Sequence, residues 1–369
     1  MVNFFRKPIF ETPAWAIFIP LLTLGILLAT YGSDLSIFSG IVACTALLTA
    51  VLVAVHHAEV IALRVGEPFG TLILALAVTV IEVSLIVTLM FSGGHATSAL
   101  ARDTVFATVM IVCNGVVGLC LLLGAWRHKV LIFRVDGTTP TLSVLAVLST
   151  LVLVLPKFTT STSDATLSNT QLAFAGVVSL LLYIVFVFVL TVRHREHFLP
   201  PSHELPKDYE PMNVKKPSNL AITVSFIFLL ISLVAVVGLA KTLAPTIESA
   251  VAAISAPIAV VGIVIALLVL LPETLSAVQA ALRNRMQISF NLALGSALAT
   301  IGLTIPTVAL ISLTMNLPLE LGLPPKEMAM LALTLLTATM TLSRNSATVL
   351  QGAVHLVLFA VFLFLSVFP

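Results

Sequence analysis

Long apolar runs with almost no charge recur along the whole chain and restrict its fold more than any other feature. They lie near residues 14–31, 37–63, 70–91, 104–124, 139–156, 171–192, 219–240, 254–276, 288–313, 327–343 and 349–368. A helix of about 20 apolar residues crosses the hydrocarbon core of a bilayer. Only 9% of the residues are charged, against about 25% in soluble domains. The sequence therefore predicts an all-α polytopic membrane protein with about eleven transmembrane helices, because β-barrel strands would alternate with a period of two.

The basic residues predict the orientation of these helices. If the N-terminus is cytoplasmic and the spans alternate, most of the 18 Lys and Arg residues fall on the cytoplasmic side: Arg6, Lys7, Arg64, Arg127, Lys129, Arg134, Arg193, Arg195, Lys207, Lys215, Lys216, Arg283, Arg285 and Arg344. Only Arg102, Lys157, Lys241 and Lys326 fall on the other side. By the positive-inside rule, we expect the N-terminus inside and the C-terminus outside a bacterial inner (cytoplasmic) membrane. The net charge of +2 does not favour a nucleic-acid partner.

The predicted spans fall into two halves. Residues 1–35 are expected to form a separate N-terminal transmembrane helix, which is retained because no small-x-small cleavage site follows its apolar stretch. Residues 194–218 contain five prolines among mixed charges and are predicted to be a cytoplasmic linker. This leaves five spans in residues 36–193 and five in residues 219–369. Because five is odd, the second set must begin on the opposite side of the membrane, and such inverted repeats are typical of secondary transporters.

One acidic residue lies deep within the third run and one deep within the eighth. Glu82 is flanked on both sides by apolar residues, and Glu273 follows the apolar run 258–271 and Pro272, a residue that can open a helix. The two stretches match at a fixed offset of 191 residues, which pairs Ala75, Leu76, Val78 and Glu82 with Ala266, Leu267, Val269 and Glu273. A charged carboxylate at the centre of a bilayer costs about 2.5 to 3.5 kcal/mol on insertion scales, so such residues usually mark ion pathways.

Buried carboxyl groups can exchange protons for cations. Burial and a like-charged neighbour both favour the protonated form, whereas a bound cation favours the ionised form. The chemistry therefore suits competition between protons and a metal cation at Glu82 and Glu273. Two glutamates neutralise one Ca2+, which takes six to eight oxygen ligands, and Na+ and K+ accept the same oxygens. No His or Cys accompanies the glutamates in their spans, which disfavours transition metals.

Several other polar residues have competing interpretations. Glu59 and Glu67 flank Arg64 at the end of the second run, where they can reach lipid headgroups or line an ion pathway. His57, beside His56, is interpreted as an interfacial or packing residue, with pH sensing as the alternative. His355 is also interpreted as a packing residue.

Two stretches of the chain resemble a known family. Residues 57–85, HAEVIALRVGEPFGTLILALAVTVIEVSL, and residues 272–308, PETLSAVQAALRNRMQISFNLALGSALATIGLTIPTV, look like the two α-repeats of the calcium/cation antiporter superfamily. The resemblance points to the bacterial ChaA-type calcium/proton and sodium(potassium)/proton antiporters and extends over nearly the whole chain. It implies one separate helix followed by two inverted five-helix repeats.

The resemblance also implies roles for individual residues. Glu82 and Glu273 are similar to the paired acids that bind cation and proton alternately, and Asn114, Ser296 and Asn291 match further polar positions of the ion site. The chain departs from the Gly-Asn-Ala-x-Glu motif of many relatives, because it reads AVTVIE before and including Glu82, and VLLPE up to Glu273.

These observations predict a secondary antiporter that exports Ca2+, with Na+ or K+ as further candidate cations, in exchange for H+. Inorganic cations, protons and the lipid bilayer are its expected partners, nucleic acid is not, no cofactor is expected, and no oligomeric state is indicated. A proton-coupled carrier of another small solute is the first alternative, although only two Trp and three Tyr are available to line a cavity. An intramembrane enzyme is the second, although the chain has no His-Glu-x-x-His or Gly-x-Ser-x-Gly motif. The run 194–197, HREH, lacks the helical spacing of a protease site.

Overall fold

The computed structural model describes residues 8–9, 12–33, 35–65, 69–93, 97–162, 166–198, 217–253, 257 and 259–368. The chain separates into two compact units. Unit 1 combines Met1–Gly93 with Met212–Ser255, and unit 2 combines Gly94–Pro211 with Ala256–Pro369. Each unit therefore contains segments from both halves of the sequence.

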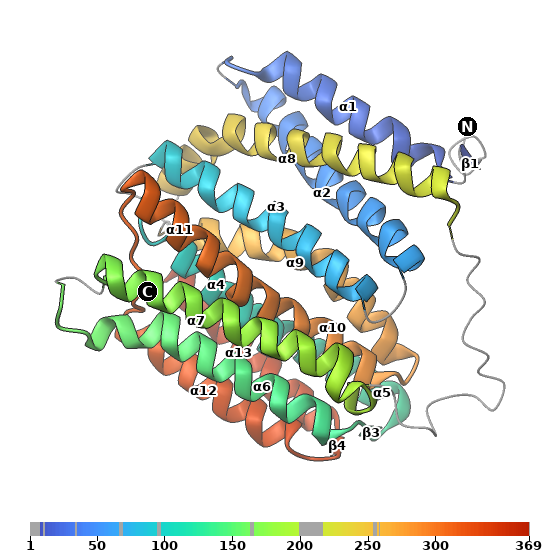
Figure 1. Cartoon of the computed structure of the whole chain (residues 1–369), viewed down its shortest axis with the longest axis vertical. Helices are drawn as coiled ribbons and strands as arrows, with labels where there is room; N and C mark the ends of the chain where they lie inside the picture. Colours follow the sequence, from blue (N-terminus) through green and yellow to red (C-terminus); the bar gives the residue numbers. More distant parts are fainter. Residues whose placement is uncertain are drawn as a thin grey trace. The chain divides into compact units, whose positions relative to one another are not determined.

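Unit 1 consists of four helices and a short strand pair in its described part. Strands β1 (Pro8–Ile9) and β2 (Thr12–Pro13) are antiparallel. The helices are α1 (Ala14–Thr30), α2 (Ile37–Val65), α3 (Phe69–Gly93) and α8 (Asn219–Ala253). Helix α2 packs against α1, α3 and α8, so a helix from the second half of the sequence completes this bundle (Figure 1).

Unit 2 contains seven helical rods in its described part, several of them built from joined segments. The bounds are α4 (Leu100–Met110), η2 (Ile111–Val116) and α5 (Val117–His128); α6 (Val135–Ser149), η3 (Thr150–Val154) and η4 (Leu155–Phe158); α7 (Asn169–Phe188) and η5 (Val189–Arg193); α9 (Ala259–Leu282); α10 (Met286–Ala299), η7 (Thr300–Thr304) and α11 (Ile305–Met315); α12 (Pro325–Leu342); and α13 (Val349–Val367). A short 3-10 turn, η6 (Arg195–Phe198), follows η5.

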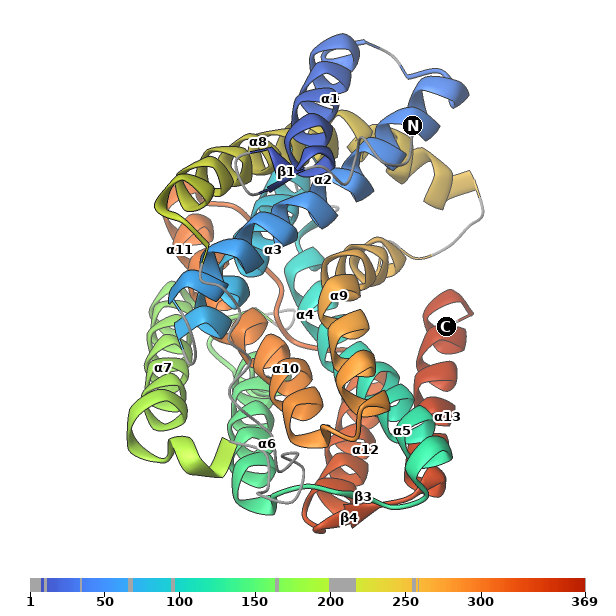
Figure 2. The same cartoon turned by 90° about the vertical axis from the view of Figure 1, so that its right-hand side faces the viewer.

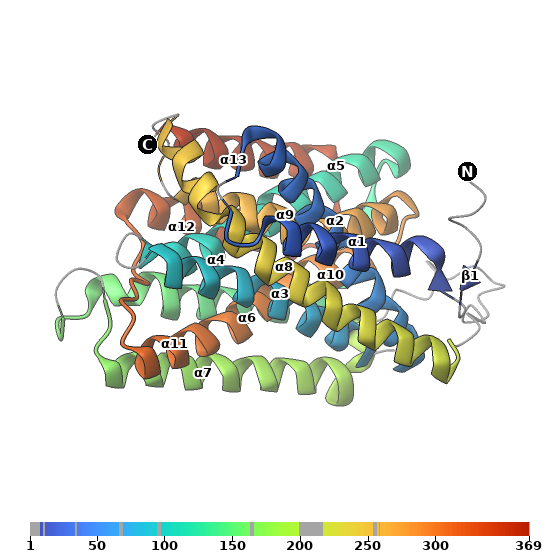
Figure 3. The same cartoon turned by 90° about the horizontal axis from the view of Figure 1, so that it is seen from above.

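The rod Leu100–His128 forms the centre of unit 2, since 89% of its apolar window is buried. Helix α4 packs against α9, α5 packs against α9 and α13, and α10 packs against α9 and α6. Helices α7 and α11 lie side by side (Figure 3). Strands β3 (Leu131–Ile132) and β4 (Ser346–Ala347) pair antiparallel beyond the ends of α5 and α12 (Figure 2).

Helix α7 shows how the apolar residues are distributed. Its exposed face carries large apolar side chains such as Phe174, Leu181 and Phe188, which are 53 to 64% exposed. Its buried face combines the small residues Ala175, Gly176 and Ser179 with the larger Leu172, Tyr183 and Phe186. Bulky apolar residues that face outward, with small residues among the helix contacts, are expected where the surroundings are lipid.

Within the described residues, seven helices are long and apolar enough to cross a membrane, or eight if the two segments of the bent α9 are one span. The prediction of a helical polytopic membrane protein is confirmed at that level. Helix α1 and the apolar stretch Leu76–Phe91 of α3 are shorter than the other candidates. The total of eleven spans and the division at residues 36–193 and 219–369 stay predictions.

Gly352 permits a close contact between α13 and α5 in the centre of unit 2. A Cβ atom at this position of α13 would lie 2.5 Å from the backbone nitrogen of Leu122 and 3.0 Å from the carbonyl oxygen of Gly118, both on α5. Backbone atoms cannot move aside as the end of a flexible side chain can, so α13 and α5 reach this separation only because residue 352 has no side chain.

We therefore expect Gly352→Val to destabilise the protein by about 1 to 3 kcal/mol through overpacking. The melting temperature of the purified protein in detergent should fall. Gly25→Val is the matched control, because nothing lies within 4 Å of a Cβ atom at Gly25. Equal melting temperatures for the two variants would contradict the assignment of a close α5–α13 contact.

Candidate ion-binding residues

Glu82 lies within the apolar stretch Leu76–Phe91 of α3 and is only 1% exposed. Val78, Ile81 and Leu85, on neighbouring turns, are buried as well. Helix α3 packs against α2 and α8 in unit 1. The predicted deep position of Glu82 in an apolar helix is therefore present in the structure.

Glu273 lies on α9 in unit 2 and is 7% exposed. The segments Ala259–Leu267 and Val269–Leu282 of α9 meet at 46°. Pro272 accounts for this bend, because proline has no N–H to donate to the carbonyl four residues earlier and its ring crowds that carbonyl. The bend therefore lies one turn before Glu273 and leaves backbone carbonyl groups there less engaged in the helix.

Asn114 lies in η2, a π-helical segment between α4 and α5, and is fully buried. Its Nδ2 donates to Oγ1 of Thr334 on α12 at 2.8 Å, and its Oδ1 lies 3.3 Å from Nδ1 of His355 on α13. Because the amide oxygen only accepts, Nδ1 of His355 is the donor. The Nε2 atom of His355 then accepts from Thr341 Oγ1, 3.1 Å away.

This network joins three rods of unit 2 through buried polar groups. Asn114 thus binds side chains of α12 and α13, and one lone pair of its Oδ1 remains for another donor or a cation. His355 is completely buried, which agrees with its interpretation as a packing residue.

Asn291 and Ser296 both lie on α10, at different depths. Asn291 Nδ2 donates to the carbonyl oxygen of Phe198 at 2.6 Å, and its Oδ1 accepts from Gln287 Nε2 at 3.2 Å. Asn291 therefore fastens the η6 turn to α10. Ser296 lies further along the helix and is buried.

The predicted site residues are distributed over both units. Glu273, Asn114, Asn291 and Ser296 occupy α9, η2 and α10, which pack against one another in unit 2. Glu82 belongs to unit 1.

The residues near the end of α2 have structural contacts. His57 is buried, its Nε2 lies 2.8 Å from the carbonyl oxygen of Ala16, and its ring stacks on Phe228. These contacts agree with a packing role, and pH sensing stays a prediction. Glu59 is half-buried, and Arg64 Nη2 donates to Asn219 Oδ1 on α8 at 3.1 Å. Glu67 lies outside the described residues.

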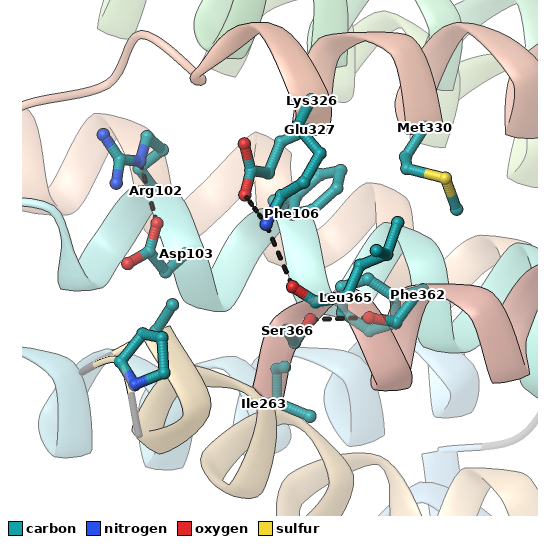
Figure 4. Close-up of a pocket in the computed structure, with 12 residues that line it drawn as sticks. Arg102, Asp103, Phe106, Ile263, Lys326, Glu327, Met330, Phe362, Leu365 and Ser366 are labelled. Carbon is teal, nitrogen blue, oxygen red and sulfur yellow. Dashed lines mark hydrogen bonds and ion pairs between the residues drawn. The ribbon is translucent and has the colours of Figure 1, made fainter. Parts of the chain in front are cut away.

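A further polar cluster lies at the start of the central rod of unit 2, around a cavity of about 110 Å3 (Figure 4). Arg102 Nε is 2.8 Å from Asp103 Oδ1, and Lys326 Nζ is 3.2 Å from Glu327 Oε1. Lys326 also donates to the carbonyl oxygen of Leu365, near the end of α13 (2.9 Å). These acidic groups already have basic partners, so we do not assign the cluster as the cation site. The hydrogen bond of Lys326 connects α12 with the end of α13.

The π-helical segments were missed from the sequence. The rod that contains Asn114 is π-helical at Ile111–Val116, and the rod that contains Ser296 is π-helical at Thr300–Thr304. Single π-turns inside α-helices are frequent at functional sites. Gly115 and Gly302 lie within these segments, but glycine alone also indicates close helix packing, so the sequence signal was ambiguous.

Buried glutamates on α3 and on the bent α9, within an apolar helical fold, are typical of membrane proteins that transport ions. The family model described as "Sodium/calcium exchanger protein" matches residues 35–192 and 224–368. The chain belongs to this family of exchangers.

Two relatives are similar over nearly their full length. A candidate ionic transporter of Sinorhizobium fredii, y4hA, is 46% identical and covers 97% of each chain. The sodium-potassium/proton antiporter ChaA of Escherichia coli is 37% identical, over 88% of this chain and 87% of its own. The predicted resemblance to the calcium/cation antiporter superfamily is thus confirmed.

Solved structures confirm the fold. The native structure of YfkE has a TM-score of 0.73 at 16% identity and covers 96% of this chain and 100% of its own. The crystal structure of the H+/Ca2+ exchanger CAX has a TM-score of 0.67 at 17% identity and covers 95% of this chain and 88% of its own.

The Asn114 network leads to a testable expectation about stability. Thr334→Val removes the acceptor of the buried Asn114 amide, and an unsatisfied buried donor costs about 1 to 3 kcal/mol. We expect a lower melting temperature in detergent for this variant. Thr339→Val, an exposed threonine of the same helix that donates to Leu335 O, is the control and should melt near the wild-type temperature. A Thr334→Val protein as stable as this control would show that the network contributes little.

Proposed function

We propose that the protein is a secondary antiporter that exports Ca2+, or Na+ or K+, in exchange for H+ by alternating access. The observation that carries this proposal is the pair Glu82 and Glu273, which occupy matching positions, 191 residues apart, in the two halves of the sequence. Each is at most 7% exposed and lies on an apolar helix. A purely structural role would not require two ionisable groups at such depth.

The proposed chemistry is the alternate protonation and cation binding of Glu82 and Glu273. A proton neutralises each carboxylate when no cation is bound, and a cation replaces that proton by direct coordination. Exchange requires that protons and the cation exclude each other at these carboxylates. The transporter can then switch between its inward-open and outward-open states only when it holds one ion or the other. Ser296 and the remaining lone pair of Asn114 are proposed to add oxygen ligands, and the bend before Glu273 adds backbone carbonyls.

The names of the relatives support proton coupling and differ on the cation. ChaA is named as a sodium-potassium/proton antiporter, and a relative in Aphanothece halophytica, 25% identical over 96% of each chain, is named as a Ca2+/H+ antiporter. Both names include protons. We place Ca2+ first because carboxylate and carbonyl oxygens are the ligands that Ca2+ prefers.

The proposed setting is the bacterial inner membrane, with the N-terminus in the cytoplasm and the C-terminus outside. In unit 2, the central rod begins near Arg102 and ends near Arg127, and β3 and β4 lie at that second end. The basic residues Arg127, Lys129, Arg134 and Arg344 lie near these strands in the sequence. This grouping agrees with placing the strand end of unit 2 in the cytoplasm.

Substitution of the glutamates tests the assignment directly. Glu82→Gln and Glu273→Gln retain an oxygen ligand and remove the titratable charge. We expect either change to reduce Ca2+- or Na+-driven proton movement in everted vesicles at least about tenfold, equivalent to about 1.4 kcal/mol. Asp136→Asn removes an exposed carboxylate from the first turn of α6 and is the matched control. Wild-type exchange by a Glu→Gln variant that is present in the membrane at normal amount would refute its role.

Competition between protons and the cation gives a second test. If both bind the same carboxylates, acidifying the cation-loading side should raise the cation concentration needed for half-maximal exchange and leave the maximal rate similar. The measurement uses vesicles with Ca2+, Na+ and K+ in turn, and choline as the control cation. A fall in the maximal rate at unchanged half-saturation would place the proton effect at other groups.

A further inference from the structure

Two histidines and a glutamate come together at the end of the rod that contains α7. The ligand atoms of His194, Glu196 and His197 all lie within 4.8 Å of one another, the one such group of three among the described residues. The rings of His194 and His197 stack with their centroids 5.1 Å apart. The sequence HREH lacks the spacing of a helical metal motif, but the chain leaves the helix here and forms a 3-10 turn, which brings the three side chains together.

The backbone of this turn is fixed at several points. His194 N–H donates to the carbonyl oxygen of Val189 at 2.9 Å, and His197 N–H donates to the carbonyl oxygen of His194 at 3.1 Å. The Phe198 ring is buried and meets Phe186 edge-on. The three candidate ligands therefore project from an ordered turn and not from a free chain end.

The same turn is also tied to α6 and α10. Arg134 Nη1 donates to the carbonyl oxygen of Glu196 at 2.7 Å, and Asn291 Nδ2 donates to that of Phe198 at 2.6 Å. A Cβ atom at Gly137 on α6 would lie 2.5 Å from the carbonyl oxygen of His197. These contacts use backbone carbonyls, so the imidazole and carboxylate groups stay available for a ligand.

We propose that His194, Glu196 and His197 form a binding site for a divalent transition metal ion of the Zn2+ class, separate from the transported cation. Two imidazoles and one carboxylate are ligands that Zn2+ accepts, with water completing the shell. Zn–N bonds of about 2.0 to 2.1 Å require ligand atoms about 3.3 Å apart, so metal binding would draw these ligand atoms closer together than they now lie. Ca2+ and Mg2+ prefer oxygen ligands and would find only one carboxylate here.

The metal would bind within a single turn, because all three proposed ligands lie between residues 194 and 197. Arg134 and Arg193 add positive charge near the turn, which weakens cation binding and favours ions with strong nitrogen coordination over ions held by charge alone. Binding would hold the turn in the arrangement that Arg134 and Asn291 already contact. The site would thus let a transition metal restrain the turn that Asn291 holds against α10, the helix that also carries Ser296.

Zinc titration of the full-length protein tests the site. The protein is purified in detergent without a histidine tag, and Zn2+ binding is measured by calorimetry. We expect one site of roughly micromolar affinity, weakened at least about tenfold in His194→Ala/His197→Ala and in Glu196→Gln. His128→Gln, on α5, is the control for nonspecific histidine binding and should bind Zn2+ as the wild type does.

Hydrogen exchange provides a readout that does not depend on transport. Zn2+ should slow amide exchange in residues 194–198 of the wild type and not in His194→Ala/His197→Ala. If that double variant fails to fold, Glu196→Gln serves for the comparison. Equal Zn2+ affinity in wild type and variants, displacement of Zn2+ by millimolar Ca2+, or loss of binding in His128→Gln alone would overturn the proposal.

Discussion

The apolar character of the helical bundle's interior is the constraint on which the rest of this structure depends. A polar group buried among apolar helices must find a partner within the protein, since an unsatisfied group costs several kcal/mol. Asn114, His355 and the threonines of α12 meet this requirement with a chain of side-chain hydrogen bonds. The same rule makes Glu82 and Glu273 informative, because a carboxyl group at such depth is stable only with a proton, a cation or a hydrogen-bond donor.

The rods that carry these polar residues depart from regular α-helix, as do the rods of α6 and α7, which contain the π-helical segments η3 and η5. Proline bends α9 beside Glu273, and π-helical segments widen the rods of Asn114 and Ser296. Each departure changes which backbone carbonyls are engaged inside the helix. A transporter of cations needs oxygen ligands in a region where the side chains are mostly apolar, and loosened backbone provides them without further charged residues.

The two ends of unit 2 are held by different contacts. At one end, Lys326 on α12 donates to the carbonyl oxygen of Leu365 on α13 (Figure 4), and Arg102 on α4 donates to that of Gly322. At the other, the β3–β4 pair, Arg134 and Asn291 fix loops and the η6 turn through backbone carbonyls. These carbonyl contacts hold the η6 turn, from which the side chains of His194 and His197 project.

The apolar runs, the deep position of Glu82 and Glu273 and the family resemblance could all be predicted from the sequence, because hydrophobic periodicity and isolated charges are local properties. Most helix bounds were predicted to within several residues. The exception is α8, which extends past its predicted end near residue 240 to Ala253. The hydrogen-bond partners of Asn114 and Asn291 could not be predicted, since they lie on helices distant in sequence. The π-helical segments were missed because they reflect packing between helices more than residue preference.

The sequence by itself determined that the chain is a helical membrane protein with two buried glutamates, because the cost of placing charge in an apolar helix depends only on local composition. Only the tertiary structure decided that Asn114 binds Thr334 and His355, that Asn291 holds the η6 turn, and that two histidines and a glutamate converge after α7. Such contacts depend on how helices and turns approach one another in space, and helix packing is set by the fit of whole surfaces.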